Sequence, residues 1–205
     1  MLRLYLCEGD SADNTLAELQ AWAVEDERIT IVKHDTGIAH HAHSTRPERM
    51  QAVSRNGNVG WDKIAADNWG DMAWMIESDL LIHPTLLRRM IERRPAVADI
   101  FAPMIWIAVN GGIRFYDLWA YRKNGEMFRP TPPAWYVARY GDDPFEVDSV
   151  GSVVLFKMDL IRAGLRLSEE TCVLGMCNRA RQEMGARVFV DPTLNVLHPT
   201  IEGIA

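Results

Sequence analysis

The sequence is short of cysteine, of long apolar runs and of positive charge, and each shortage excludes a class of protein. Three cysteines in 205 residues are an odd and sparse count, which argues against a disulfide framework and favours a reducing compartment. Apolar runs such as 101–109 fall far short of the roughly 20 residues that span a membrane. The first residues show no basic stretch followed by an apolar core, so we expect no signal peptide and a cytoplasmic location.

The charge and the missing motifs narrow the function further. A formal net charge of −6 gives no support to general nucleic-acid binding. The absence of a Gly-x-x-x-x-Gly-Lys-Ser/Thr loop argues against a P-loop enzyme. The sequence is 48% hydrophobic and 24% charged, which are ordinary values for a globular protein, and a chain of this length suits one domain.

Apolar strand segments alternate with helical patterns along the chain, which predicts an α/β fold with an open, mostly parallel central sheet flanked by helices. The stretch 110–148 is rich in glycine, proline and aromatic residues, so we expect long loops with short strands there. From Asp191 onward we expect a loop. The predicted strands are 2–7, 28–33, 71–76, 98–109, 150–156 and 187–190, and the predicted helices are 15–24, 46–66 with a break at 56–58, 84–94 and 168–184.

The best single candidate for a site is the acidic triplet Glu77-Ser78-Asp79, which directly follows an apolar strand. In open α/β sheets, ligands bind outside the carboxyl ends of the strands. Two carboxylates at that edge can hold Mg²⁺ or Mn²⁺ while diphosphate oxygens fill other positions. The same triplet also suits a solvated turn that begins the next helix, and the sequence leaves both interpretations open.

Two further segments carry side chains that suit binding. The turn 8–15 places carboxylates after the first predicted strand, where they can accept hydrogen bonds from a nucleoside, although Asp13 also suits a helix cap. His198 follows the last predicted strand, and a neutral imidazole is a good ligand for Mn²⁺. A single histidine near the end of a chain is more often a surface residue. The histidines of the segment 40–43 lack a helical spacing, so we expect them to be loop residues.

Further segments follow in a fixed order along the chain. Together with those above they are Glu8-Gly9-Asp10-Ser11-Ala12-Asp13-Asn14-Thr15, Arg55-Asn56, Trp74-Met75-Ile76-Glu77-Ser78-Asp79, Phe115-Tyr116-Asp117-Leu118-Trp119-Ala120, Val147-Asp148-Ser149-Val150-Gly151, Ser168-Glu169-Glu170, Asn178-Arg179-Ala180-Arg181 and Gly185-Ala186-Arg187-Val188. In this order they resemble the GT-A glycosyltransferases, especially the inverting family 2 and the Anp1-like mannosyltransferases. The resemblance covers nearly the whole chain and depends on motifs that are weak singly and occur in one order. His198 falls where the family often has a third metal ligand.

The resemblance implies a nucleotide-diphospho-sugar transferase-like domain over 1–205, with a nucleotide-sugar-binding half at 1–109 and an acceptor-binding half at 110–205. It implies a hexosyltransferase that uses Mn²⁺ or Mg²⁺ to move a sugar from a nucleoside diphosphate sugar to an acceptor hydroxyl. The residues it implies are Glu77, Asp79 and His198 for the metal; Glu8, Ser11, Asp35, Arg55, Asn56 and Ser78 for the donor; Trp119, Trp135 and Tyr136 for the acceptor; and Glu170, Glu169 or Asp148, in that order, for the catalytic base.

The chain departs from the family pattern in two respects. The family begins with one more strand and helix before the turn at Glu8, so we expect an exposed sheet edge, or an element supplied by an upstream segment or another chain. The metal triplet starts with Glu77 rather than Asp, and Glu169-Glu170 is two residues further from its helix than usual.

Other functions remain open at this point. A non-catalytic nucleotide- or sugar-binding relative and a metal-dependent nucleotidyltransferase are the alternatives to a glycosyltransferase. The acceptor is also open: a polysaccharide, a lipid-linked sugar, a protein, a small molecule or the modified DNA bases of a phage would all fit. The sequence does not decide whether the protein is a homo-oligomer.

Overall fold

A computed structural model describes residues 2–38, 46–109, 112–128 and 141–199. The chain forms two compact units, one made of residues 1–70 and 161–176 and the other of residues 71–160 and 177–205. These units are defined by contacts, whereas the border predicted at residue 109 divides donor binding from acceptor binding. That functional division stays a prediction.

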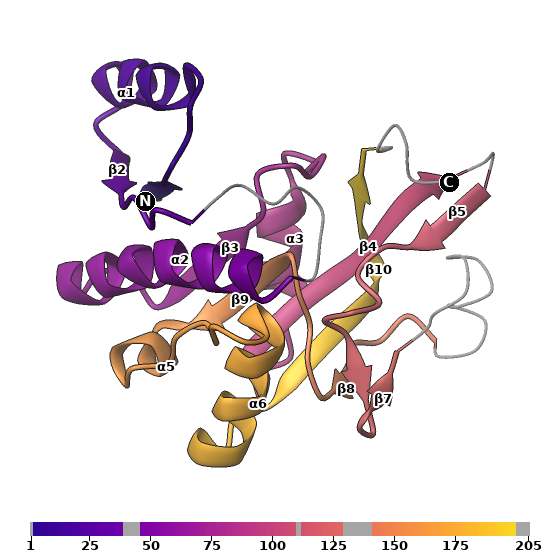
Figure 1. The fold of residues 1–205 in the computed structure, drawn as a ribbon. Coiled ribbons are helices and arrows are strands. Elements are labelled where there is room, and N and C mark those ends of the chain that lie inside the picture. Colours follow the sequence, from indigo (N-terminus) through magenta and orange to yellow (C-terminus); the bar gives the residue numbers. More distant parts are fainter. Residues whose placement is uncertain (1, 39–45, 110–111, 129–140, 200–205) are drawn as a thin grey trace. The chain divides into compact units, whose positions relative to one another are not determined.

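The first unit is built on a parallel pair of strands, β1 (Leu4–Glu8) and β2 (Ile29–Lys33). Helix α1 (Thr15–Glu25) connects them, as parallel strands require a crossover, and α2 (Pro47–Asp67) follows. Figure 1 shows α1 and α2 on opposite sides of the two strands. Both strands and both helices lie within a few residues of their predicted ranges.

Helix α2 corrects one prediction. We expected a break at 56–58, but the helix is continuous from Pro47 to Asp67. Its glycines serve close packing: a Cβ on Gly57 would overlap the side chain of Leu167, and a Cβ on Gly60 would overlap the thiol of Cys7 in β1. The gain from this packing outweighs the roughly 1 kcal/mol that glycine costs in a helix interior.

The second unit contains a six-stranded sheet with the order β3-β9-β4-β10-β8, and β5 pairs with β4. Strands β4 and β10 run parallel, and the other neighbours in this sheet are antiparallel. The α/β class is therefore confirmed, while this sheet is mixed rather than mostly parallel. The bounds are β3 Met72–Ile76, β4 Ile100–Val109, β5 Gly112–Phe115, β8 Phe145–Val147, β9 Val153–Lys157 and β10 Val188–His198.

Shorter elements complete the described chain. They are α3 (Leu86–Arg93), α5 (Met158–Arg162), α6 (Cys172–Met184) and the hairpin of β6 (Arg122–Lys123) with β7 (Glu126–Met127). Helix α6 begins four residues later than predicted, and α5 was not predicted. The core of the second unit is centred on β4, whose residues 100–106 are all buried.

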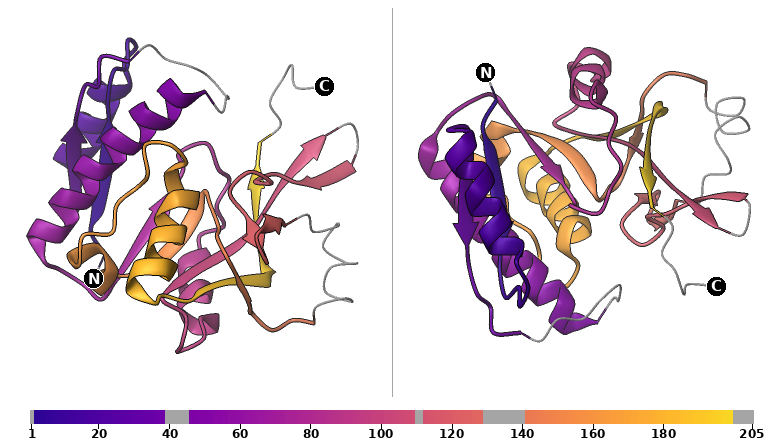
Figure 2. Two further views of the ribbon diagram at one scale, coloured as in Figure 1. Left: turned by 60° about the horizontal axis from the view of Figure 1, so that its bottom comes forward. Right: turned by 90° about the horizontal axis from the view of Figure 1, so that it is seen from above.

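Strand β10 corrects the prediction of a loop from Asp191 onward. It pairs with β4 as far as His198 and shifts register between Asp191 and Asn195. Pro103 of β4 stands opposite Asp191 at this shift, and because proline cannot donate to a sheet, a bulge is where sheets tolerate it. Figure 2 shows β4 and β10 side by side in both views. His198 is therefore at the end of a central strand rather than in a tail.

Candidate functional site

The acidic turn after β3 is attached to the neighbouring strands by its backbone. The amide of Glu77 donates to the carbonyl of Ser152 at 2.9 Å, and the amide of Leu81 donates to the carbonyl of Leu197 at 2.9 Å. Leu81 and Leu197 form an isolated antiparallel bridge. These bonds bring Asp79 to the end of β10, although the two segments are far apart in the sequence.

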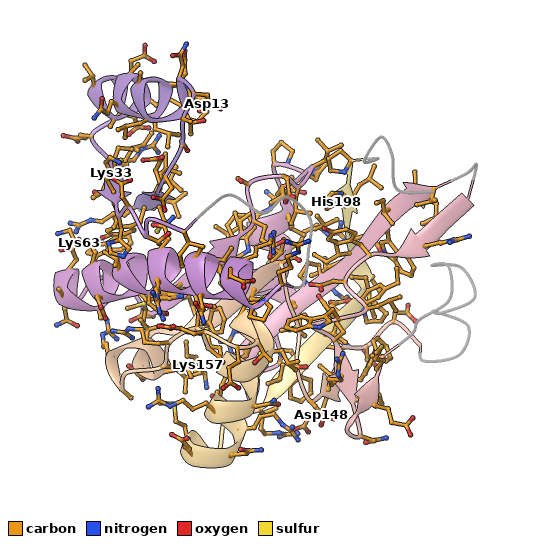
Figure 3. The ribbon with its side chains drawn as sticks, in the orientation of Figure 1. Asp13, Lys33, Lys63, Asp148, Lys157 and His198 are labelled. Carbon is orange, nitrogen blue, oxygen red and sulfur yellow. The ribbon has the colours of Figure 1, made fainter. Side chains whose placement is uncertain are left out.

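At this point Asp79 meets His198, which Figure 3 shows at the end of β10. The two nearest atoms, Oδ2 of Asp79 and Nε2 of His198, are 3.3 Å apart. His198 is 1% exposed and Asp79 is 40% exposed at the side chain. The ring of Tyr116 stacks on the imidazole with a centroid distance of 3.9 Å and an interplanar angle of 26°. A buried imidazole thus faces a partly solvated carboxylate.

The hydrogen-bond partners of His198 determine what this pair can bind. Its Nδ1 lies 2.7 Å from the carbonyl oxygen of Pro199. Because a carbonyl only accepts, Nδ1 carries a hydrogen, and a neutral ring then presents a bare Nε2 to Asp79. Two lone-pair atoms at 3.3 Å repel unless a proton or a cation lies between them. The pair therefore suits either a protonated imidazole or a bound cation.

The geometry of the pair fits a divalent cation. Two ligands at right angles, each about 2.1 Å from one ion, lie about 3 Å apart, close to the 3.3 Å between these atoms. Within the described part of the chain, no group of three His, Cys, Asp or Glu side chains is arranged to hold a metal. Asp79 and His198 come together, and Glu77 stays the predicted third ligand. Mg²⁺ is commonly bound by few protein ligands, while water and phosphate oxygens fill its other coordination positions.

Asp117 is a half-buried carboxyl group near this pair to which the sequence assigned no role. It directly follows Tyr116, accepts a hydrogen bond from the hydroxyl of Ser152 at 2.8 Å and accepts another from the amide of Ala120 at 3.3 Å. Burial raises its pKa above the ordinary 3.8, against the opposing effects of these two hydrogen bonds and of Arg122 and His198. The only signal in the sequence was its place in the segment 115–120 that carries part of the resemblance.

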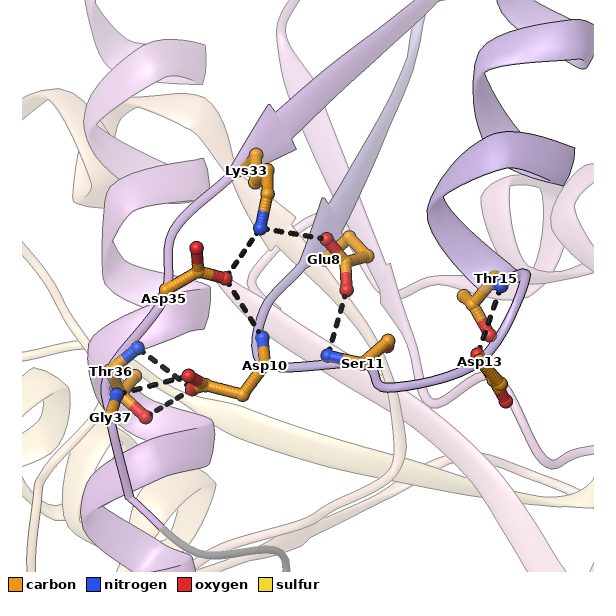
Figure 4. A network of polar contacts seen from close by, with 9 residues as sticks. All are labelled: Glu8, Asp10, Ser11, Asp13, Thr15, Lys33, Asp35, Thr36 and Gly37. Carbon is orange, nitrogen blue, oxygen red and sulfur yellow. Dashed lines mark hydrogen bonds and ion pairs between the residues drawn. The ribbon is translucent and has the colours of Figure 1, made fainter.

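In the first unit, the turns after β1 and β2 are tied together by two aspartates (Figure 4). The Asp10 carboxylate accepts from the amide of Thr36 at 2.7 Å, from its hydroxyl at 2.5 Å and from the amide of Gly37 at 3.0 Å. In return, Asp35 accepts from the amide of Asp10 at 3.0 Å and forms an ion pair with Lys33 at 2.5 Å. Asp35, predicted to bind the donor, is thus already engaged within the protein.

Glu8 can accept more hydrogen bonds than it receives from the described residues. Its Oε1 accepts from the amide of Ser11 at 3.2 Å, while its Oε2 is buried and accepts no hydrogen bond from the described residues. Lys33 is the nearest charge to Oε2, at 3.7 Å. Asp13 accepts from the amide of Thr15 at 2.9 Å, but the N-cap position of α1 is Asn14, which forms no side-chain capping bond.

Arg55 and Asn56 lie near the same strand end, on α2. Arg55 forms an ion pair with Glu169 at 2.9 Å, which lowers the pKa of that carboxyl group. The Cγ of Asn56 would lie 3.4 Å from a Cβ on Gly9, and its buried Oδ1 has no hydrogen-bond partner among the described residues. Glu170, the first candidate for the catalytic base, is exposed.

Asp148, the third candidate for the base, has structural partners. It forms an ion pair with Arg181 at 2.9 Å and accepts from the amide of Gly125 at 2.6 Å. It lies next to the start of β10, whereas His198 ends that strand (Figure 3). Along β4 these two positions are level with 100 and 107, a difference of seven residues, or about 23 Å. Asp148 is therefore remote from the Asp79–His198 pair.

The remaining predicted residues are described only in part. Ser78 is exposed in the acidic turn and Trp119 is half-buried in the loop after β5. Trp135 and Tyr136, as well as the histidines of 40–43, lie outside the described residues.

Comparison with known proteins gives a likeness of fold. No protein-family model and no curated protein matches the sequence significantly. A mannosyltransferase from Pyrobaculum calidifontis, PcManGT, solved with GDP-Man and Mn²⁺, matches with a TM-score of 0.56 and 13% identity over 99% of this chain and 49% of that chain. GalNAc-T7, solved with UDP, GalNAc and Mn²⁺, matches with a TM-score of 0.55 and 12% identity over 98% of this chain and 37% of that chain.

A mycobacterial protein also matches, with a TM-score of 0.51 and 12% identity over 95% of this chain and 55% of that chain. This chain thus spans about half or less of the length of these neighbours. At such identities the likeness shows the fold alone: a mixed α/β protein with a central sheet and flanking helices, similar to the GT-A glycosyltransferases. In the described residues, no helix is both long enough and apolar enough to cross a membrane.

Proposed function

We propose that this chain is a divalent-cation-dependent glycosyltransferase that moves a sugar from a nucleoside diphosphate sugar to an acceptor hydroxyl. One observation carries the proposal: Nε2 of the buried His198 faces Oδ2 of Asp79 at 3.3 Å, while Nδ1 is occupied by Pro199. This arrangement suits a cation at the end of a central strand. The fold likeness supports it, because PcManGT and GalNAc-T7 were each solved with Mn²⁺ and a nucleotide or nucleotide sugar.

In this proposal, Asp79 and His198 hold Mn²⁺ or Mg²⁺, and Glu77 contributes directly or through water. A cation held there would supply positive charge that offsets the negative charge of the leaving diphosphate. The contact of His198 with Pro199 keeps Nε2 directed at the cation, as such second contacts do for metal-bound histidines. Ser78, on the same turn, is the donor-binding candidate nearest these ligands in the sequence.

For the first unit taken by itself, we propose contacts with a nucleoside. Glu8 and Asn56 are the stronger candidates, since each has a buried oxygen that lacks a hydrogen-bond donor among the described residues. Ser11 and Arg55 remain candidates through their exposed positions. Asp35 would have to exchange one of its internal partners for the donor.

A general base must accept the proton of the acceptor hydroxyl. The Arg55 guanidinium lowers the pKa of the Glu169 carboxyl group and makes it a weaker base, while Asp148 is engaged by Arg181 and by the amide of Gly125. Glu170 is exposed and is therefore the preferred candidate among the three. Trp119, Trp135 and Tyr136 are proposed to stack on the acceptor.

Thermal unfolding with UDP, GDP, dTDP or CDP, each with and without MnCl₂, tests the proposal. A ligand at 100 times its Kd adds about 2.7 kcal/mol to stability, which raises Tm by about 5–11 °C for a chain of this size. We expect one nucleotide to give a shift that requires Mn²⁺. Asp79→Asn should abolish that shift, whereas Asp71→Asn, which removes an exposed carboxylate at the other end of β3, should keep it.

The outcomes separate the candidate functions. No Mn²⁺-dependent shift with any nucleotide, or an equal shift in Asp79→Asn, would refute the proposed site. Binding without release of nucleoside diphosphate from any sugar nucleotide would favour a non-catalytic relative. Release of pyrophosphate from a nucleoside triphosphate would favour a nucleotidyltransferase.

A further inference from the structure

Two consecutive residues of the loop after β5 connect this loop to both partners of the Asp79–His198 pair. Tyr116 stacks on the imidazole of His198 at 3.9 Å. Asp117, the next residue, accepts the hydroxyl hydrogen bond of Ser152 at 2.8 Å. Ser152 in turn accepts the amide of Glu77 through its carbonyl oxygen at 2.9 Å. One loop thus contacts the histidine directly and the acidic turn through a single intermediate residue.

Ser152 has an unfavourable backbone conformation, which a neighbouring interaction must stabilise. Its φ is +62°, in the left-handed region that residues other than glycine seldom adopt. The carbonyl group of this left-handed residue is the one that accepts the hydrogen bond from the amide of Glu77. The hydrogen bond from the Ser152 hydroxyl to Asp117 is the described side-chain interaction of this residue, and it opposes the relaxation of the backbone.

The neighbouring glycine shows how closely Asp117 fits. A Cβ on Gly151 would overlap Oδ2 of Asp117 and would lie 2.6 Å from the Cβ of Ala120. The carboxyl group therefore lies directly against the 151–152 backbone. A second hydrogen bond, from the amide of Ala120 at 3.3 Å, fixes its other oxygen. These contacts fix the position of the Asp117 carboxyl group, which can therefore fix the hydroxyl of Ser152 in turn.

We propose that Asp117 is a positioning residue for the cation site: through Ser152 it fixes the turn that carries Asp79, while the adjacent Tyr116 fixes the imidazole of His198. The proposal rests on the proposed function, because it assumes that Asp79 and His198 bind a cation. Asp117 itself need not contact the ion. Its loss should weaken cation binding, and the rate at saturating cation should change little.

Titration with MnCl₂, followed by the electron paramagnetic resonance signal of free Mn²⁺, measures this directly. It uses the full chain with the nucleoside diphosphate that stabilises the wild-type protein. Loss of a partner that orients metal ligands lowers affinity about 10–100-fold, and we expect this for Asp117→Ala and for Ser152→Ala. The double variant should bind no more weakly than the weaker single variant, because both substitutions break one hydrogen bond.

Two further variants complete the test. Asp117→Asn keeps a carbonyl oxygen that can accept the Ser152 hydroxyl, so it should retain most of the affinity and also serves if Asp117→Ala does not fold. Ser149→Ala removes a hydroxyl that donates to the carbonyl of Ala120 at 2.5 Å and is not linked to Glu77. This matched control should bind Mn²⁺ as the wild-type protein does.

The possible failures are distinguishable. If the wild-type protein binds no Mn²⁺, the proposed function fails and this inference fails with it. If the wild-type protein binds Mn²⁺ and the Asp117 and Ser152 variants bind it equally well, only the inference is overturned. It is also overturned if Asp117→Ala keeps its Mn²⁺ affinity but loses more than a hundredfold in turnover at saturating Mn²⁺, since Asp117 would then act in the chemistry.

Discussion

Replacing Gly9 by alanine tests the close approach between the ends of β1 and β2. A Cβ on Gly9 would overlap the carbonyl oxygen of His34 and would lie 3.2 Å from its carbonyl carbon. Because these are backbone atoms, no side-chain rotation relieves the overlap, and the two strand ends must separate. Their separation would strain the bond from the amide of His34 to the carbonyl of Glu8, now 2.9 Å long.

The expected cost follows from the kind of overlap. Overpacking costs about 1–3 kcal/mol, and a rigid backbone neighbour favours the upper end. Alanine also restricts the unfolded chain, which returns up to about 1 kcal/mol. We therefore expect Gly9→Ala to lose about 2 kcal/mol, a fall in Tm of about 4–8 °C for a chain of this size.

Thermal unfolding followed by far-ultraviolet circular dichroism measures this loss. Gly112→Ala is the matched control, because the one contact of an added Cβ there with the described residues is the carbonyl oxygen of Val109, at an ordinary 3.7 Å. The control should stay within about 0.5 kcal/mol of the wild-type protein. Equal stability of Gly9→Ala and Gly112→Ala would refute the close approach of the two strand ends. It would also remove the reason for a glycine at the end of β1.

Two predictions concern carboxylates outside the proposed cation site. Arg93 forms an ion pair at 2.5 Å with the fully buried Asp191, so Arg93→Ala should cost about 3 kcal/mol by urea unfolding. If adding Asp191→Asn restores none of this loss, the uncompensated charge is not its cause. The hydrogen bonds from Thr36 and Gly37 lower the pKa of Asp10 below its ordinary 3.8, so the carboxylate stabilises the protein above that pH, and this contribution is lost as the pH falls through the folded-state pKa. Asp10→Asn, which tolerates the same left-handed backbone, should lower Tm at pH 7, and its difference from the wild-type protein should shrink as the pH falls through the folded-state pKa; a constant difference would contradict this linkage.

The sequence predicted the elements whose signals are local. Apolar or β-branched segments bounded by polar turns gave β1, β2, β3, β4 and β9 with small errors at their ends. The errors arose where the local structure depends on contacts with residues that are far away in the sequence. The segment 56–58 predicted a break in α2, but Leu167 packs against Gly57 within it. A loop was predicted from Asp191 onward, but β10 continues through a bulge opposite Pro103. Neither neighbour can be identified from the local sequence.

The candidate site likewise contains residues that the sequence predicted and residues that it did not. Asp79 and His198 were singled out by chemical type and position, and the structure brings them together across 119 residues of sequence. Tyr116, Asp117 and Ser152 were not singled out, because their roles depend on a stacked ring, a hydrogen bond and a left-handed backbone. Residue type alone indicates none of these three properties.

The turns after β1 and β2 show why residue type can also predict too much. Asp35 suits a nucleoside contact by type and position, yet it is occupied by Lys33 and by the amide of Asp10. Glu8 differs because its Oε2 is buried with Lys33 only at 3.7 Å. A buried acceptor without a hydrogen-bond donor is costly, so a donor from a ligand would gain more at Glu8 than at Asp35. For the proposed nucleoside contact, this cost favours Glu8 over Asp35, an order that their similar chemistry and positions in the sequence could not give.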